Sequence, residues 1–474
     1  MTPKGFIARR EVILSDPYDR YILDMPALQR KYAYQLWPLE RLKRYVDMLS
    51  EFGFNSLQVS DLAEDYACCG YAITREELGE KLHALADYAK SKGMTRTLFV
   101  WGSGPVDVER SRGTMHDGSW QNPCPCVPGG NEALDKHYRL QARHAPWFDH
   151  VITHWADPGG CYGGKCTLAT ACELHNRIVA GFRKHNGDIR STYSLWLMHH
   201  REFGARWRGY DSVKSILYAG VLGEDVGLAQ GGRFSLEEAR SIARSGRPLG
   251  VWGWYLADDE IVPSIHVHTG FLGDYFNALP REASTLLSWH SVDSNCHGLN
   301  VPGLYVAGQL MMDPRRHAEA VLREFCRRAF GKAADGFAKG LLAVAHTRCR
   351  SDYLRLIKFL TGFPHKGSPD EEENPEQHLE IVRKARKVVD VLKVDPSFRP
   401  DLPLIIDPKT FLEELKVHLR VIEQYARFRI ALAETETKRG KIDPASLPAV
   451  EPPGEFMSQF EYRLAQEHLA FLRK

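Results

Sequence analysis

The first 330 residues alternate between short apolar runs and longer segments whose apolar residues recur every three or four positions. Short apolar runs are typical of buried strands, and the wider spacing is typical of helices with one buried face. The expected helices are residues 38–53, 75–93, 133–145, 172–187 and 235–246. The eight expected strands are residues 6–14, 56–60, 95–101, 150–155, 192–198, 225–230, 248–254 and 285–290.

This alternation predicts the fold. Parallel strands need a crossover connection, and a helix usually supplies it. Eight strands that alternate with helices therefore predict an α/β chain with a (β/α)8 TIM barrel.

The pattern changes near residue 331. All ten tryptophans lie between Trp37 and Trp289, nine of the ten cysteines precede Gly331, and the remainder has apolar residues at helical spacing, as in 378–394 and 411–430. We therefore expect a catalytic barrel domain over 1–330 and a C-terminal α-helical domain over 331–474.

Composition narrows the function. A formal net charge of +2 gives no indication of a nucleic-acid partner, and no apolar run reaches the roughly 18 residues of a membrane span. The first residues do not have the pattern of a secretory leader, so a cytoplasmic location with reduced thiols is expected.

A barrel of this type carries its chemistry on the loops that follow the carboxyl ends of its strands. Aromatic, acidic and histidine side chains gather at the expected ends. Flat aromatic rings beside carboxylates suit a sugar, which has an apolar face and many hydroxyls. The candidate substrate-binding residues are Asp61, Trp101, Trp196, His199, Arg201, Trp252, Trp254, Tyr255, Trp289, His290 and Asp293.

Cofactors are not expected. The chain has no G-x-x-x-x-G-K-S sequence and no G-x-G-x-x-G after the first strand, so a nucleotide cofactor is not indicated. Cys161, Cys166 and Cys172 could be zinc ligands, but no C-x-x-C pair is present. We predict no metal site, while a metal-dependent hydrolase stays an alternative.

Several segments together resemble the TIM-barrel glycosidases related to α-glucuronidases and β-N-acetylhexosaminidases. They are WPLERLKRYVDMLSEFGFNSLQVSD (37–61), HWADPGGCYGGKC (154–166), GVWGWYLADDE (250–260) and the segment HGLNVPGLYVAGQLMMDPRRHAEAVLREFCRRAFG (297–331). The resemblance covers about residues 5–331 and implies a glycoside hydrolase with its acid on the loop after the fourth strand.

The resemblance carries over only in part. Asp157 has a counterpart in those enzymes, but the glutamate that serves them as general acid does not, because glycines follow Pro158. The acid could be Asp157, His154 or a residue from another strand. Glu224 and Asp225 are interpreted as a helix-to-strand turn at the start of the sixth strand, at the bottom of the barrel, and are not expected in the site. The second carboxyl is expected among Asp258, Asp259 and Glu260, beyond the seventh strand.

The expected function is the cleavage of a glycosidic bond in a substituted glycan, with an amino sugar or an acidic sugar, by carboxyl acid/base catalysis. His199 and Arg201 would suit a carboxylate or sulfate on such a sugar. A retaining, inverting or substrate-assisted mechanism stays open. The alternative is a catalytically silent carbohydrate-binding barrel. The expected partners are an oligosaccharide or glycoside and, in a homodimer, a second copy of the chain.

Overall fold

The computed structural model describes most of the chain between residues 6 and 470 in separate stretches. They are residues 6–14, 30–31, 33–59, 73–102, 123–154, 168–194, 225–229, 246–253, 287–294, 298–344, 375–437 and 443–454, with positions 27, 244, 462, 465–466 and 469–470.

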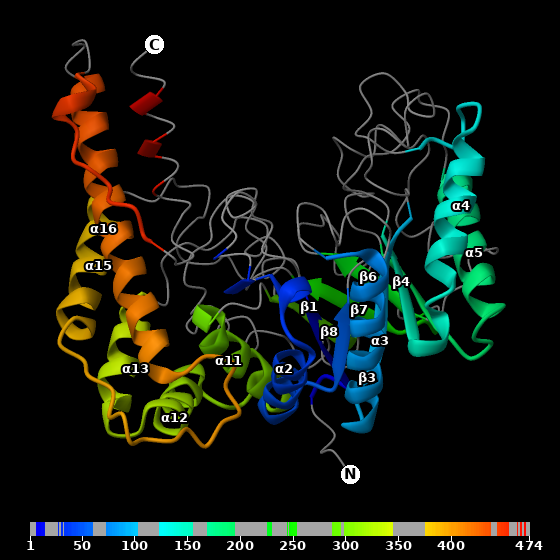
Figure 1. Ribbon diagram of the computed structural model, residues 1–474, viewed down its shortest axis with the longest axis horizontal. Coiled ribbons are helices and arrows are strands. Elements are labelled where there is room, and N and C mark those ends of the chain that lie inside the picture. The colour runs from blue at the N-terminus through cyan, green and yellow to red at the C-terminus, as the bar shows by residue number, and fades with distance from the viewer. Residues whose placement is uncertain are drawn as a thin grey trace.

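Eight parallel strands close into a barrel in chain order, with β8 paired to β1 (Figure 1). The strands are β1 (Arg9–Leu14), β2 (Ser56–Val59), β3 (Thr95–Trp101), β4 (His150–His154), β5 (Arg190–Ser194), β6 (Asp225–Ala229), β7 (Leu249–Gly253) and β8 (Leu287–Ser294). The expectation of a parallel α/β sheet is confirmed.

One described strand boundary, that of β8, differs from the expectation. β5 is described as far as Ser194, and residues 195–198 of the expected fifth strand lie outside the described residues. The prediction that the eighth strand ends at residue 290 is wrong, because β8 continues to Ser294. The added residues, 291–294, are mostly polar. They continue the strand because Val292 pairs with Val12 of β1 and Ser294 pairs with Leu14. Backbone pairing with β1, rather than hydrophobicity, therefore sets the length of β8.

Helices connect the first five strands and run outside the sheet (Figure 1). Local sequence explains their ends. Gly53 ends α2 with a left-handed φ of 100°, which favours glycine. Thr74 and Glu77 form a reciprocal capping box at the start of α3. The helices are α2 (Leu39–Phe52), α3 (Arg75–Ser91), α4 (Gly130–Ala142) and α5 (Leu168–Arg183), as expected, whereas the helix expected over 235–246 lies almost entirely outside the described residues.

The chain after β8 is helical in its described parts. The helices are α11 (Val301–Met312), α12 (Ala318–Phe330), α13 (Ala334–Ala343), α15 (Pro375–Val389) and α16 (Pro408–Thr437). No described helix has the length and apolar character needed to cross a membrane.

Aromatic contacts join these helices to the barrel. Phe52 of α2 lies edge-on to Phe325 of α12 at 6.3 Å, and Phe330 lies 5.2 Å from Phe411 of α16. Phe325 and Phe330 are themselves 5.9 Å apart, so the chain of rings is continuous. A single buried cluster thus extends from the barrel helices to α16.

Candidate active site

The barrel interior is polar near the amino ends of the strands. Arg9 of β1 donates from Nη1 to Nδ1 of His150 at 3.0 Å, across the interior, since β1 and β4 are not neighbours. Nε2 of His150 then carries the proton and donates to Oγ1 of Thr192 at 2.6 Å. Burial and the positive charges of Arg9 and Arg190 hold the pKa of His150 well below its ordinary value, so its imidazole is neutral.

A buried carboxylate lies further along β1. Oε2 of Glu11 accepts hydrogen bonds from the hydroxyls of Ser56 at 2.7 Å and Thr97 at 2.6 Å. Its other oxygen, Oε1, is buried and has no hydrogen-bond partner in the described structure. Since buried polar atoms are normally paired, Glu11 keeps one acceptor available inside the barrel.

Gln58 lies one residue before the carboxyl end of β2 and pairs in register with Ile13 of β1 and Thr97 of β3. Its side chain is fully buried, and neither its Oε1 nor its Nε2 has a hydrogen-bond partner among the described residues. An amide has one acceptor and two donors of hydrogen bonds, which are the groups that bind a sugar hydroxyl.

Trp289 is part of the interior rather than the rim. It is the third residue of β8 and pairs in register with Arg9, whose guanidinium lies 4.7 Å from the ring centroid. Gly250 on β7 faces the same ring, because a Cβ built there would lie 1.9 Å from two ring atoms. The ring is 1% exposed and therefore buried in the amino-terminal part of the barrel.

His290 lies on the opposite face of β8 from Trp289, because side chains alternate along a strand. It is fully buried on the outer side of the barrel, and burial lowers its pKa to about 4. Its Nδ1 lies 2.9 Å from the carbonyl oxygen of Ser291. The prediction that His290 contacts a sugar at the barrel mouth does not agree with this position.

Four other predicted site residues lie at the carboxyl ends of their strands. Trp101 and His154 are the last residues of β3 and β4 and pair with each other in register. Asp293 is the penultimate residue of β8, and Trp252 is the penultimate residue of β7. Neighbouring strands lie about 4.8 Å apart, so the backbone brings these residues to one rim as two neighbouring pairs.

The remaining predicted site residues lie outside the described residues. They are Asp61, Asp157, Trp196, His199, Arg201, Trp254, Tyr255, Asp258, Asp259 and Glu260. Asp225 is the first residue of β6 and lies at the amino-terminal end of the strand, as expected.

The polar interior of the barrel is not among the expectations from the sequence. The available signal was the pair Arg9 and Glu11, two charges at alternate positions of an expected strand, which places both on one face. Metal ligation has no support from the described residues, in which no three histidine, cysteine or acidic side chains gather as ligands. The described cysteines Cys124, Cys126, Cys172 and Cys326 are not in disulfide bonds.

Comparison with known proteins places this fold among glycosidases. No protein-family model matches the chain. No curated protein matches it either.

Solved structures are similar in fold only. An O-GlcNAc hydrolase from Thermobaculum terrenum is 10% identical with a TM-score of 0.50, over 98% of this chain and 94% of that one. A family 89 glycoside hydrolase from Clostridium perfringens, in complex with its substrate GlcNAc-α-1,4-galactose, is 9% identical with a TM-score of 0.53, over 99% of this chain and 53% of that one. The chain thus has a glycosidase-like fold, as the sequence resemblance implied.

Proposed function

We propose that the chain is a glycoside hydrolase that cleaves a glycan containing a 2-acetamido sugar. The observation that supports it is the parallel barrel with Trp101, His154, Trp252 and Asp293 at its carboxyl-end rim. Enzymes with this fold carry their chemistry at that rim. The similar solved structures are named for substrates with N-acetylglucosamine, which favours that sugar over an acidic one.

Asp157 is the proposed general acid. It follows the last residue of β4 by three positions, so its loop begins at the rim beside the end of β3. The second carboxyl comes from Asp258, Asp259 or Glu260, which begin five positions after the end of β7. His154 is the alternative acid. A substrate-assisted route, in which the acetamido oxygen replaces the protein nucleophile, needs only one protein carboxyl to protonate the leaving oxygen.

The remaining predicted residues would complete the sugar site. Trp196, Trp254 and Tyr255 would supply aromatic faces, while Asp61, His199 and Arg201 would bind hydroxyl or acidic groups. Beneath them, Gln58 has unused hydrogen-bonding atoms close to the same rim. A sugar hydroxyl that reaches Gln58 would satisfy an otherwise costly buried amide.

A catalytically silent carbohydrate-binding barrel is the second candidate. The sequence observation that favours it is the lack of a glutamate after Asp157, where glycines follow Pro158. Such a barrel would bind the same glycans with the same aromatic residues but would not turn them over.

The test compares wild type with Asp157→Asn on α- and β-linked disaccharides of N-acetylglucosamine, in which the leaving sugar oxygen must be protonated. We expect kcat/KM to fall by about 10²–10⁴, the usual contribution of general acid catalysis. Asp188→Asn is the matched control, because Asp188 is exposed and precedes β5 at the opposite end of the barrel. Sugar binding without turnover by wild type would instead support the silent barrel.

The finer architecture belongs to the same proposal. A complete (β/α)8 barrel over 1–330 and a separate helical domain over 331–474 stay predictions. So do a homodimer and a cytoplasmic location.

A further inference from the structure

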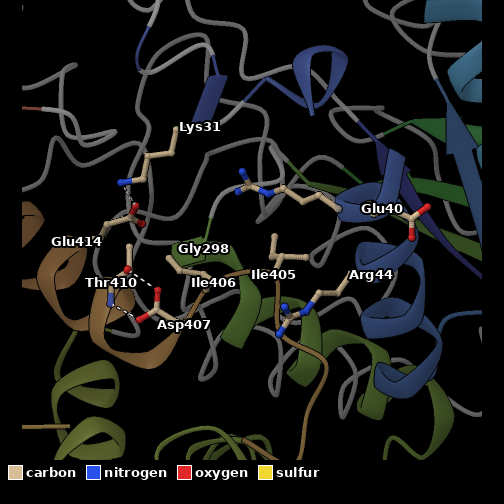
Figure 2. A pocket seen from close by; sticks show the side chains of 10 residues that line it. Lys31, Glu40, Arg44, Gly298, Ile405, Ile406, Asp407, Thr410 and Glu414 are labelled. Atoms are coloured by element: carbon tan, nitrogen blue, oxygen red, sulfur yellow. Dashed lines mark hydrogen bonds and ion pairs between the residues drawn. The ribbon is translucent and has the colours of Figure 1, made fainter. Parts of the chain in front are cut away.

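A pocket of about 630 Å³ lies between the first turns of α2, residue 298 and the start of α16 (Figure 2). Three basic and three acidic side chains line it, and Lys31 and Glu414 among them form an ion pair at 2.7 Å. Its balanced charges give no indication of a charged ligand. A pair of histidines among the barrel helices is different, because the ordinary pKa of histidine, about 6.5, lies close to neutral pH.

The two histidines meet between α3 and the short helix η2 (Ala145–Trp147). Nε2 of His83, in the middle of α3, lies 2.8 Å from Nδ1 of His144, which directly precedes η2. The ring of Trp147 stacks on the ring of His83, with the centroids 3.6 Å apart and the planes within 4° of parallel. Gly79 leaves room for His144, because a Cβ at Gly79 would lie only 3.9 Å from Cε1 of that ring.

The hydrogen bond between the two rings limits how many protons they hold. A neutral imidazole has one N–H group and one acceptor nitrogen, whereas an imidazolium has two N–H groups and no acceptor. The pair keeps its hydrogen bond when both rings are neutral and also when one of them is protonated. When both rings are protonated, two N–H groups and two positive charges face each other, so the hydrogen bond is lost.

Neighbouring charges set the order in which the rings take up protons. Burial lowers the pKa of His83, but the carboxylate of Asp87, one turn further along α3, favours the protonated ring. Burial lowers the pKa of His144 to about 4, and the positive charges of His83 and Arg143 act in the same direction. The first proton is therefore expected on His83 and the second on His144.

The histidine pair joins α3 to the segment that leads into β4. η2 ends at Trp147, and β4 begins three residues later at His150. A second contact holds this segment, because Nδ2 of Asn186 donates to the carbonyl oxygens of Ala145 at 3.2 Å and Phe148 at 2.9 Å. Loss of the histidine pair would therefore loosen η2 from α3 without releasing the segment from the rest of the barrel.

We propose that His83 and His144, together with Trp147, form a pH-sensitive contact that holds η2 against α3 at neutral pH and releases it in acid. With one proton, the His83 imidazolium still donates to His144 and stacks on the indole of Trp147, which attracts a cation. The second proton, on His144, breaks the contact. Because the pKa of His144 in the folded chain is about 4, below the unfolded value of about 6.5, the stabilisation is complete above pH 6.5 and is lost as the pH falls toward 4.

The test measures local opening and not turnover, so it is independent of the proposed hydrolysis. Hydrogen–deuterium exchange of the full chain is followed by mass spectrometry at pH 7 and pH 5, with each rate divided by the intrinsic rate at that pH. The amides of Trp147 and Phe148 report on η2, because they donate to the carbonyl oxygens of His144 and Ala145. We expect their protection in wild type to fall about tenfold between pH 7 and pH 5.

His144→Asn is the informative variant, because the asparagine amide occupies the position of Nδ1 and can form the hydrogen bond but does not titrate. We expect its protection to change by less than about twofold between the two pH values. His185→Asn is the matched control, because His185 is exposed and follows α5. It should behave as wild type. An equal loss of protection in wild type and His144→Asn, or a pH dependence that His185→Asn also removes, overturns the proposal.

A second measurement decides the case in which His144→Asn is already loosened at pH 7. The Cε1–H signals of the histidines are titrated by NMR in wild type, and the signals of His83 and His144 are assigned by their loss in His83→Gln and His144→Asn. We expect the His144 signal to stay at its neutral position down to about pH 5 and to move only toward pH 4. A His144 signal that titrates with a midpoint near 6.5 overturns the proposal.

Discussion

The packing of Trp289 on Gly250 is the feature of the barrel interior most open to a direct test. Gly250 pairs with Trp289 beside a register shift between β7 and β8, so the backbone and the ring approach closely. In Gly250→Ala the new methyl group would lie 1.9 Å from ring atoms Cδ2 and Cε2. Carbon atoms in contact are about 3.5–4.0 Å apart, so the ring or the strand must move by about 1.6 Å or more.

The expected loss of stability in Gly250→Ala depends on how tightly the Trp289 ring is packed. Trp289 is 1% exposed, and the guanidinium of Arg9 lies 4.7 Å from its centroid. Adding atoms to a packed core usually lowers the free energy of unfolding by about 1–3 kcal/mol. For a displacement of this size in a closed barrel, we expect a loss at the upper end of that range. At a urea slope of about 3 kcal/mol per molar, the unfolding midpoint of Gly250→Ala should fall by about 1 M.

Urea unfolding followed by circular dichroism measures this effect. Gly79→Ala is the control, because the nearest atom to its Cβ is 3.9 Å away in the middle of helix α3. The free energy of unfolding of this control should rise by about 0.5–1 kcal/mol, because alanine has a higher helix propensity than glycine. Trp289→Leu removes the ring. In that background, Gly250→Ala should lower the free energy of unfolding by at least about 1 kcal/mol less than it does in the wild-type background. An unchanged midpoint for Gly250→Ala in the wild-type background would refute the described packing.

Two further changes test the helices. Thr74→Ala removes the capping box of α3 and should lower the free energy of unfolding by about 1 kcal/mol in a urea titration. Glu423 of α16 is 8% exposed and accepts a hydrogen bond from Arg386 of α15 at 2.7 Å. Burial opposes its ionisation, but hydrogen bonds from Arg427 and Arg386 outweigh it and lower its pKa. Its stabilisation is present above the unfolded pKa of about 4.3 and is lost as pH falls through the lower folded pKa. Glu423→Gln should therefore cost about 1.5–3 kcal/mol at pH 7 and clearly less at pH 3, whereas an equal cost at both values would contradict this role.

The alternation of strands and helices could be predicted from the sequence, because strands are short apolar runs, whereas the apolar residues of helices recur every three or four positions. Apolar runs identified all eight strands, and helical spacing identified α2 to α5. The end of β8 could not be predicted in this way. Its last residues are mostly polar, and only the register with β1 shows that Asp293 and Ser294 continue the ladder.

The sequence predicts the candidate site only at the strand ends, because the end of a strand depends on residues that are close to it in the sequence. Trp101 and His154 lie at the ends of their strands as expected, and the barrel then places them side by side. The contact between Arg9 and His150 joins residues 141 positions apart. Nothing in the sequence near either residue indicates that contact, because it depends on closure of the whole sheet.

The polar interior changes how this barrel is stabilised. Barrels of this type usually fill the interior with branched apolar side chains, but here Arg9, Glu11 and His150 occupy it in hydrogen-bonded groups. Buried ion and hydrogen-bond networks of this kind contribute little net stability, because desolvation offsets their attraction. The main buried cluster of apolar side chains, which includes Val12 and Leu14, lies between the strands and the surrounding helices. The interior is packed around Trp289, but Gln58 and Glu11 have buried polar atoms without a hydrogen-bond partner among the described residues, so these two side chains are available for polar recognition.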